Sequence, residues 1–141
     1  MAGKPLEGLR VLIIEDEAMI AMLIEDLLGE IGASAVKTVA SVSEAAKILG
    51  DAIRLDMAIV DVNLHGQSTF PLADMLLERG IPFIFATGYA ATGMPERFSS
   101  VPVLQKPFEL EQLKRALLAA KHSNDLATRR TGAGDGGLTG A

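Results

Sequence analysis

Acidic residues directly follow two of the most apolar segments of the chain. The segment VLII at 11–14 is followed by Glu15 and Asp16, and the segment MAIV at 57–60 is followed by Asp61. Carboxylates that lie close together repel one another. A hard divalent cation relieves that repulsion, and oxygen ligands without Cys or His suit Mg²⁺. If the two segments form neighbouring strands, their acids predict a magnesium site.

Two further polar residues lie at the ends of later apolar segments. Thr87 ends IPFIFAT at 81–87, and Lys106 follows VPVLQ at 101–105. A hydroxyl and an ammonium group supply the hydrogen-bond donor and the positive charge that phosphoryl oxygens require. A carboxylate such as that of Asp61 can itself accept the phosphoryl group and become an acyl phosphate. These residue types therefore predict phosphoryl transfer assisted by Mg²⁺.

A parallel sheet would bring these residues together. Short segments rich in Val, Ile and Phe predict strands at 9–14, 33–39, 56–61, 81–87 and 101–105. Apolar side chains at helical spacing predict helices at 17–31, 41–50, 68–80 and 109–122. Between 90 and 100, Gly93 and Pro95 allow only a short or irregular helix. Strand and helix therefore alternate along the chain, which indicates the α/β class with right-handed crossovers.

The alternation predicts a flavodoxin-like (βα)5 three-layer sandwich. The chain is too short for a closed eight-stranded barrel. We therefore expect an open, parallel five-stranded sheet with the strand order 2-1-3-4-5. Ligands bind beyond the carboxyl ends of the strands in such a sheet, and strands 1 and 3 are neighbours. Glu15, Asp16 and Asp61 should thus converge on one edge.

The helix boundaries carry signals of their own. Gly32 follows the segment 17–31 at the position of a C-cap. Ser41 and Glu44 have the spacing of a capping box. Pro71 falls in a first helical turn, where its missing N–H costs little.

Composition excludes several other classes of protein. The chain has 141 residues, a net charge of −5 and no cysteine, so disulfides and thiolate metal sites are excluded. The acidic balance argues against binding to nucleic acid. No apolar segment is long enough to span a membrane, and the N-terminus does not resemble a signal peptide, so a cytoplasmic location is expected. Residues 123–141 hold five of the 14 glycines and predict a disordered tail.

The motifs IIEDE, IVDVNL, FATG and LQKPF, in this order and at these distances, resemble the receiver domain of two-component response regulators. The resemblance covers residues 8–122. It implies that Asp61 is the phosphoacceptor and that Asp16 binds Mg²⁺ directly, with Glu15 bound through water. The backbone carbonyl of Asn63 is the implied further ligand.

The same resemblance implies roles for the polar residues at the ends of the other two strands. It implies that Thr87 provides the switch hydroxyl and that Lys106 pairs with the phosphoryl group. The family commonly has a cis peptide before the proline of this motif, which here is the Lys106–Pro107 bond.

Three positions depart from the pattern of many receivers. His65 stands where many have proline, and Val103 stands where many have the aromatic residue of the Thr/aromatic switch. Tyr89 lies two residues after Thr87 instead. The sequence FATGY at 85–89 resembles a subgroup named for its FAT-GUY motif, which is often served by histidine kinases of the HWE or a related type. We expect Tyr89 and residues 90–100 to carry the response to phosphorylation.

The resemblance implies a stand-alone receiver. It would accept a phosphoryl group from a histidine kinase or a phosphotransfer protein, and it would signal by contact with another protein or act as a phosphate sink. It would be no enzyme beyond self-phosphotransfer and autodephosphorylation. Two other classes stay open. A pseudo-receiver usually lacks the acceptor, an acid or the lysine, and none is missing here. A phosphatase with an aspartyl nucleophile would need a second Asp where this chain has Asn63.

Overall fold

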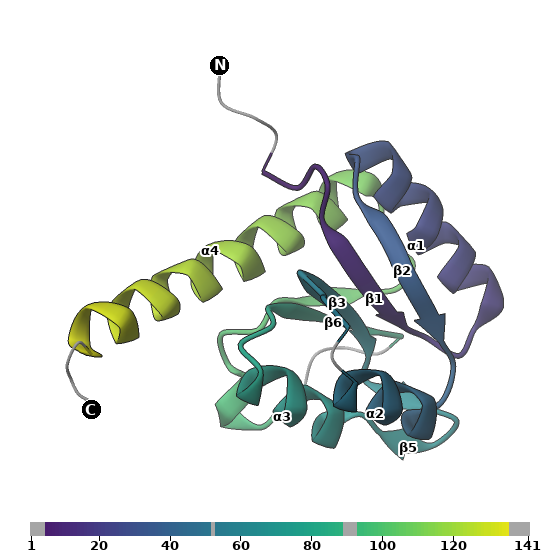
Figure 1. The fold of residues 1–141 in the computed structure, drawn as a ribbon. Helices are drawn as coiled ribbons and strands as arrows, with labels where there is room; N and C mark the ends of the chain where they lie inside the picture. Colours follow the sequence, from purple (N-terminus) through teal and green to yellow (C-terminus); the bar gives the residue numbers. More distant parts are fainter. Residues whose placement is uncertain (1–4, 52, 89–92, 136–141) are drawn as a thin grey trace.

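Five parallel strands form the centre of the molecule (Figure 1). This computed structural model describes residues 5–51, 53–88 and 93–135, and for 125–135 it describes the backbone alone. The strands of the sheet are β1 (Arg10–Ile14), β2 (Ser34–Val39), β3 (Met57–Asp61), β6 (Phe83–Thr87) and β7 (Val103–Gln105). Their spatial order is β2-β1-β3-β6-β7. Counted along the chain within this sheet, that is the predicted order 2-1-3-4-5, so the flavodoxin-like topology is confirmed.

Helices cover both faces of the sheet. They are α1 (Ala18–Ile31), α2 (Val42–Gly50), α3 (Phe70–Glu78) and α4 (Leu110–Asp135). Successive strand residues point to opposite faces, and the core is divided accordingly. Val11 and Ile13 pack in the cluster that includes residues of α1 and α4, whereas Leu12 and Ile14 pack with α2 and α3. The predicted three layers are therefore present.

The ends of the helices follow the predicted signals. Gly32 ends α1 with a φ of 92°, a left-handed conformation that glycine adopts without a steric penalty. The Ser41 hydroxyl accepts a hydrogen bond from the Glu44 N–H at 3.2 Å and so caps α2. Pro71 lies in the first turn of α3. These local contacts fix where each helix begins or ends.

The connection from β6 to β7 lacks a regular helix within its described residues. Residues 89–92, which include Tyr89, lie outside the described residues, and a single 3₁₀ turn, η1 (Glu96–Phe98), follows them. This agrees with the short or irregular helix predicted there. Phe98 anchors the turn, because its buried ring lies 5.4 Å from Phe85 and 5.5 Å from Phe70.

A two-stranded hairpin after β3 was not predicted. Its strands β4 (Asn63–Leu64) and β5 (Gln67–Ser68) pair antiparallel across a two-residue turn. His65 and Gly66 form this turn with φ values of 49° and 84°. Positive φ at both central residues is what a type I′ turn requires.

The last helix corrects the predicted boundary at residue 122. Its backbone continues to Asp135, so the helix is longer than the predicted segment 109–122, while the disordered tail at 123–141 stays a prediction and 136–141 lie outside the described residues. The physical reason lies in the sequence SNDLATRR at 123–130, which has no proline or glycine and contains strong helix formers. Among the described residues, no helix is both long and apolar enough to cross a membrane.

Candidate functional site

The carboxyl ends of four strands bring the predicted residues to one edge of the sheet. Glu15 and Asp16 follow β1, and Asp61 and Thr87 are the last residues of β3 and β6. Lys106 follows β7 directly. One pocket at this edge is lined by Asp16, Glu17, Asp61, Val62, Asn63, Thr87, Gly88 and Lys106. The predicted convergence of three acids, a hydroxyl and an ammonium group is therefore confirmed.

Lys106 lies at the centre of the acids. Its Nζ atom is 3.1 Å from Oε1 of Glu15, 3.1 Å from Oδ2 of Asp61 and 3.1 Å from Oε1 of Glu17. The side chains of Lys106, Glu15 and Asp61 are at most 8% exposed, so water screens the contacts of Lys106 with Glu15 and Asp61 little. The interpretation of the sequence did not include Glu17. Its only signal there is its place directly after the acid pair, which is equally typical of the start of a helix.

Glu15 is the buried member of the acid pair. Burial raises the pKa of its carboxyl to about 7, against the opposing effect of the Glu17 N–H, which donates to Oε2 at 3.0 Å. The charge of Asp61 raises this pKa further, and Lys106 lowers it. Burial therefore favours the protonated form of Glu15 more than in a solvent-exposed glutamate.

Asp16 and Lys106 are both held in their charged forms. Burial favours the neutral form of Asp16, but the His65 N–H donates to its Oδ2 at 3.0 Å, and the net effect is a lowered pKa. Burial also opposes the charge of Lys106, yet its hydrogen bonds to Glu17, Glu15 and Asp61 raise the lysine pKa above its usual range. The pocket thus combines a fixed cation with several carboxylates.

The backbone around Asp61 is fixed by hydrogen bonds. Oδ1 of Asp61 accepts from the Asn63 N–H at 3.2 Å, opposite the contact of Oδ2 with Lys106. The hydroxyl of Thr69, which is fully buried, donates to the carbonyl oxygens of Asp61 at 2.6 Å and Val62 at 2.9 Å. Thr69 was not predicted as part of this site, because nothing in its sequence context distinguishes it from an ordinary helix cap.

Thr87 and Lys106 are joined through their backbones. The Lys106 N–H donates to the Thr87 carbonyl oxygen at 2.7 Å, and Thr87 is 7% exposed at the pocket. The Lys106–Pro107 peptide is cis, as predicted. Val103, at the position of the missing aromatic, is half-buried against the cluster on the α2 and α3 face.

The acids are arranged to suit a cation. Glu15, Asp16 and Asp61 each offer a carboxylate oxygen, and these three oxygens lie within 4.8 Å of one another. Hard oxygen donors without nitrogen or sulfur are the set that Mg²⁺ prefers. Asn63 lines the same pocket, and its side-chain oxygen is engaged in the hairpin by the Gly66 N–H at 2.8 Å. The donor set therefore fits the predicted ion.

The comparison with protein families decides the assignment. The family model described as the response regulator receiver domain matches residues 11–118, which include all of the predicted site residues. The chain belongs to this receiver family. Receiver domains generally bind Mg²⁺ at an acidic pocket of the kind formed by Glu15, Asp16 and Asp61.

Individual relatives support the assignment to the receiver family. The phyllosphere-induced regulator PhyR of Methylorubrum extorquens is 30% identical over 128 residues, which cover 85% of this chain and 46% of the relative. The receiver thus spans about half the length of the curated relatives it matches. The solution structure of SdrG from Sphingomonas melonis Fr1 is 40% identical, covers 85% of this chain and 98% of its own, and has a TM-score of 0.70.

A second similar structure is the BeF3-activated conformation of SdrG. It comes from a bacterium named Pseudomonas melonis Fr1 and is 44% identical to this receiver. The alignment covers 79% of this chain and 95% of the other, with a TM-score of 0.69.

The structure explains why this receiver lacks proline at position 65. Proline fixes φ near −65° and has no N–H. The φ of His65 is 49°, and its N–H donates to Asp16. Both features exclude proline from this hairpin.

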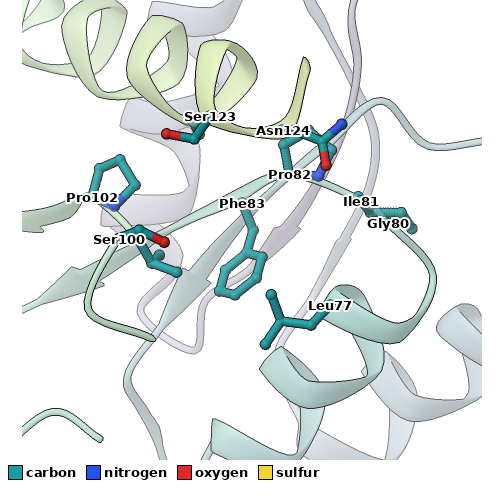
Figure 2. Close-up of a pocket in the computed structure, with 11 residues that line it drawn as sticks. Leu77, Gly80, Ile81, Pro82, Phe83, Ser100, Pro102, Ser123 and Asn124 are labelled. Atoms are coloured by element: carbon teal, nitrogen blue, oxygen red, sulfur yellow. The ribbon is translucent and has the colours of Figure 1, made fainter. Parts of the chain in front are cut away.

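A second hollow lies at the opposite ends of β6 and β7 (Figure 2). It is lined by Leu77, Gly80, Ile81, Pro82, Phe83, Ser100, Val101, Pro102, Ala120, Ser123 and Asn124. None of these side chains titrates near neutral pH, so they supply no group for phosphoryl transfer. Of these two hollows, the pocket around Asp61 is the one lined by titratable side chains.

Proposed function

We propose that this receiver accepts a phosphoryl group on Asp61 from a phosphohistidine. The observation that carries the proposal is the ammonium group of Lys106, 3.1 Å from Oδ2 of Asp61 in a pocket that also holds Thr87. A cation at this distance offsets the charge that develops on a transferred phosphoryl group. The BeF3-activated conformation of SdrG supports the proposal, because beryllofluoride mimics an acyl phosphate.

The transfer uses one oxygen of Asp61 as the nucleophile. It attacks phosphorus, and a P–O bond forms while the P–N bond of the phosphohistidine breaks. The electron pair of that bond returns to the imidazole nitrogen, which takes a proton from solvent. Lys106 pairs with the phosphoryl oxygens, and the hydroxyl of Thr87 donates a hydrogen bond to one of them.

The acidic pocket would hold Mg²⁺ during this reaction. Its ligands would be carboxylate oxygens of Asp16 and Asp61, the backbone carbonyl of Asn63, and Glu15 through water. When bound, Mg²⁺ supplies positive charge that offsets the repulsion between the carboxylates and the incoming phosphoryl oxygens.

The partners follow from this chemistry. We propose a histidine kinase of the HWE or a related type, or a phosphotransfer protein, as the donor in the cytoplasm. The phosphorylated receiver would act by contact with a downstream protein or as a phosphate sink, and it would catalyse only its own phosphorylation and dephosphorylation. The sequence FATGY at 85–89 supports the choice of kinase type.

Two observations favour this function over its alternatives. A pseudo-receiver is disfavoured because the acceptor, the acids and the lysine lie together in one pocket. A phosphatase acting on external esters is disfavoured because Asn63, which has no acidic proton, stands where the acid/base Asp would be needed.

A labelling experiment tests the proposal. With Mg²⁺ and radiolabelled acetyl phosphate, or with the phosphorylated kinase, the wild type should acquire an acid-labile label, and Asp61→Asn should remove it. Asp51→Asn changes an exposed aspartate at the C-terminal end of α2 that does not line the pocket, and this variant should label as the wild type does. A label that survives Asp61→Asn would reject the assignment of the acceptor.

A further inference from the structure

Glu17 does not perform the structural task of its position. It is the N-cap residue of α1, where a side chain usually accepts a hydrogen bond from the first turn. The Glu17 side chain makes no such bond. Its Oε1 lies 3.1 Å from Nζ of Lys106 instead, although 63% of the side chain is exposed. Helix capping therefore does not explain this carboxylate, whose partner Lys106 belongs to the pocket.

The ammonium protons of Lys106 are all engaged in this arrangement. Its ammonium group carries three protons, and the three carboxylates of Glu15, Glu17 and Asp61 surround it at 3.1 Å each. A phosphoryl group on Asp61 brings new oxygens that need the same ammonium group. These new oxygens therefore compete with the three carboxylates for the ammonium protons of Lys106.

Glu17 is the carboxylate that can leave. The Glu15 side chain is 1% exposed and accepts a hydrogen bond from the Glu17 N–H. Asp61 is itself the proposed phosphoacceptor. Glu17 alone among these three has an exposed side chain that can turn into water. Until the Glu17 side chain turns away, its negative charge remains close to Asp61. Its Oε1 and the Asp61 Oδ2 each lie 3.1 Å from one nitrogen, so they are no more than about 6 Å apart, a distance at which their charges repel each other.

We propose that Glu17 is a positioning residue that slows the phosphorylation of Asp61 and selects donors by charge. It occupies Lys106, and it repels anionic phosphodonors at the mouth of the pocket. A small donor with a large negative charge is disfavoured most. This inference rests on the proposed phosphorylation of Asp61.

The test compares two donors in the wild type and in Glu17→Gln, at saturating Mg²⁺. In each reaction an Asp61 oxygen forms the P–O bond, and the leaving group takes the electron pair of the broken bond: acetate from acetyl phosphate, ammonia from phosphoramidate. Phosphoramidate carries less net negative charge because its nitrogen is protonated. Glu17→Gln should raise the rate of phosphorylation by acetyl phosphate on the order of three- to ten-fold, and the rate with phosphoramidate by less. Beryllofluoride, as an equilibrium probe, should bind the variant tighter by a similar factor.

Matched variants separate this role from a general change in charge. Glu30→Gln removes the same charge from an exposed residue of α1 about 20 Å further along the helix, beyond the reach of screened interactions, and should leave all rates unchanged. Glu17→Ala should change the rates in the same direction as Glu17→Gln, which excludes a specific effect of the new amide.

The outcomes distinguish the inference from the function on which it rests. If the wild type is labelled and Glu17→Gln reacts equally fast or more slowly with both donors, Glu17 does not restrain the site. Equal acceleration of both donors would overturn the selection by charge. If no donor labels the wild type, the proposed function is wrong, and the inference falls with it.

Discussion

At the scale of single residues, four carboxylates and one ammonium group lie close together in the pocket. Glu15, Asp16 and Asp61 lie within 4.8 Å of one another, and Glu17 contacts the same lysine. Lys106 offsets only part of this negative charge. In the metal-free site the carboxylates therefore repel one another. A bound cation or the loss of one negative charge reduces this repulsion.

The buried carboxyl of Glu15 makes stability depend on pH in the metal-free protein. Its pKa rises from 4.5 to about 7 on folding, so the folded state holds a proton that the unfolded chain has released. Stability should therefore fall as the pH rises from about 5 to about 8, by at most about 3 kcal/mol. Urea unfolding in the presence of a chelator measures this slope.

The Glu15→Gln variant isolates that effect. It should be more stable than the wild type at pH 8 and should show a flatter pH profile, because the amide does not ionise. Added Mg²⁺ should stabilise the wild type at pH 8, since it binds the folded site alone. Parallel profiles for the two proteins would mean that Glu15 does not hold the extra proton.

Residue types and their order predicted the acids, Thr87 and Lys106, because each stands directly at the end of an apolar strand. They did not predict Glu17 and Thr69. A glutamate at a helix start and a threonine before a helix both have ordinary local explanations. Their contacts with Lys106 and with the Asp61 carbonyl depend on the packing of distant segments.

At the scale of elements, the hairpin β4–β5 ties the loop after β3 to the acid pair. The His65 N–H bonds to Asp16, and Asn63 closes the turn by accepting from Gly66. A non-glycine residue with φ of 49° carries a conformational cost, which asparagine and glycine bear more easily.

Substitution of His65 should expose this constraint. His65→Pro should destabilise the protein by about 3 kcal/mol or more, because proline cannot adopt the positive φ or donate to Asp16. His65→Gly and His65→Asn should stay within about 1 kcal/mol of the wild type. Chemical denaturation at pH 7 measures the differences. A proline variant of unchanged stability would show that the hairpin adopts another turn in solution.

Sequence patterns predicted the long elements well and the short ones poorly. The strand predicted at 56–61 matches β3 within one residue, because a continuous apolar segment bounded by acids leaves few alternatives. The two-residue strands β4 and β5 are too short to carry a periodic pattern. The turn η1 is held by the packing of the Phe98 ring, and that packing is a tertiary contact.

At the scale of the whole molecule, α4 extends well past the part of it that packs on the sheet. Its described core residues are Leu113, Ala116, Leu117 and Ala120. Figure 1 shows the rest of the helix running beyond the sheet. The tail was predicted from its glycines, Gly132 and Gly134 among them, yet the helix passes through both.

Two truncations should separate the packed part of α4 from its extension. A chain that ends at Asn124 keeps these core residues, so its melting temperature should fall by no more than about 3 °C. A chain that ends at Arg115 loses Ala116, Leu117 and Ala120 and should not fold stably, because several buried side chains are removed. Circular dichroism during heating measures both. A large loss of stability in the longer chain would mean that residues after 124 also pack on the domain.

The strand order has a consequence for the order in which the site becomes complete during synthesis. Asp61 ends the central strand, which pairs with β1 on one side and with β6 on the other, while Lys106 follows the last strand of the sheet. A nascent chain that has reached β6 already contains the acceptor and the acid pair but not the lysine. A receiver that is still being synthesised therefore has the carboxylates without their cation, and under the proposed function it should accept a phosphoryl group only after β7 and Lys106 have been made.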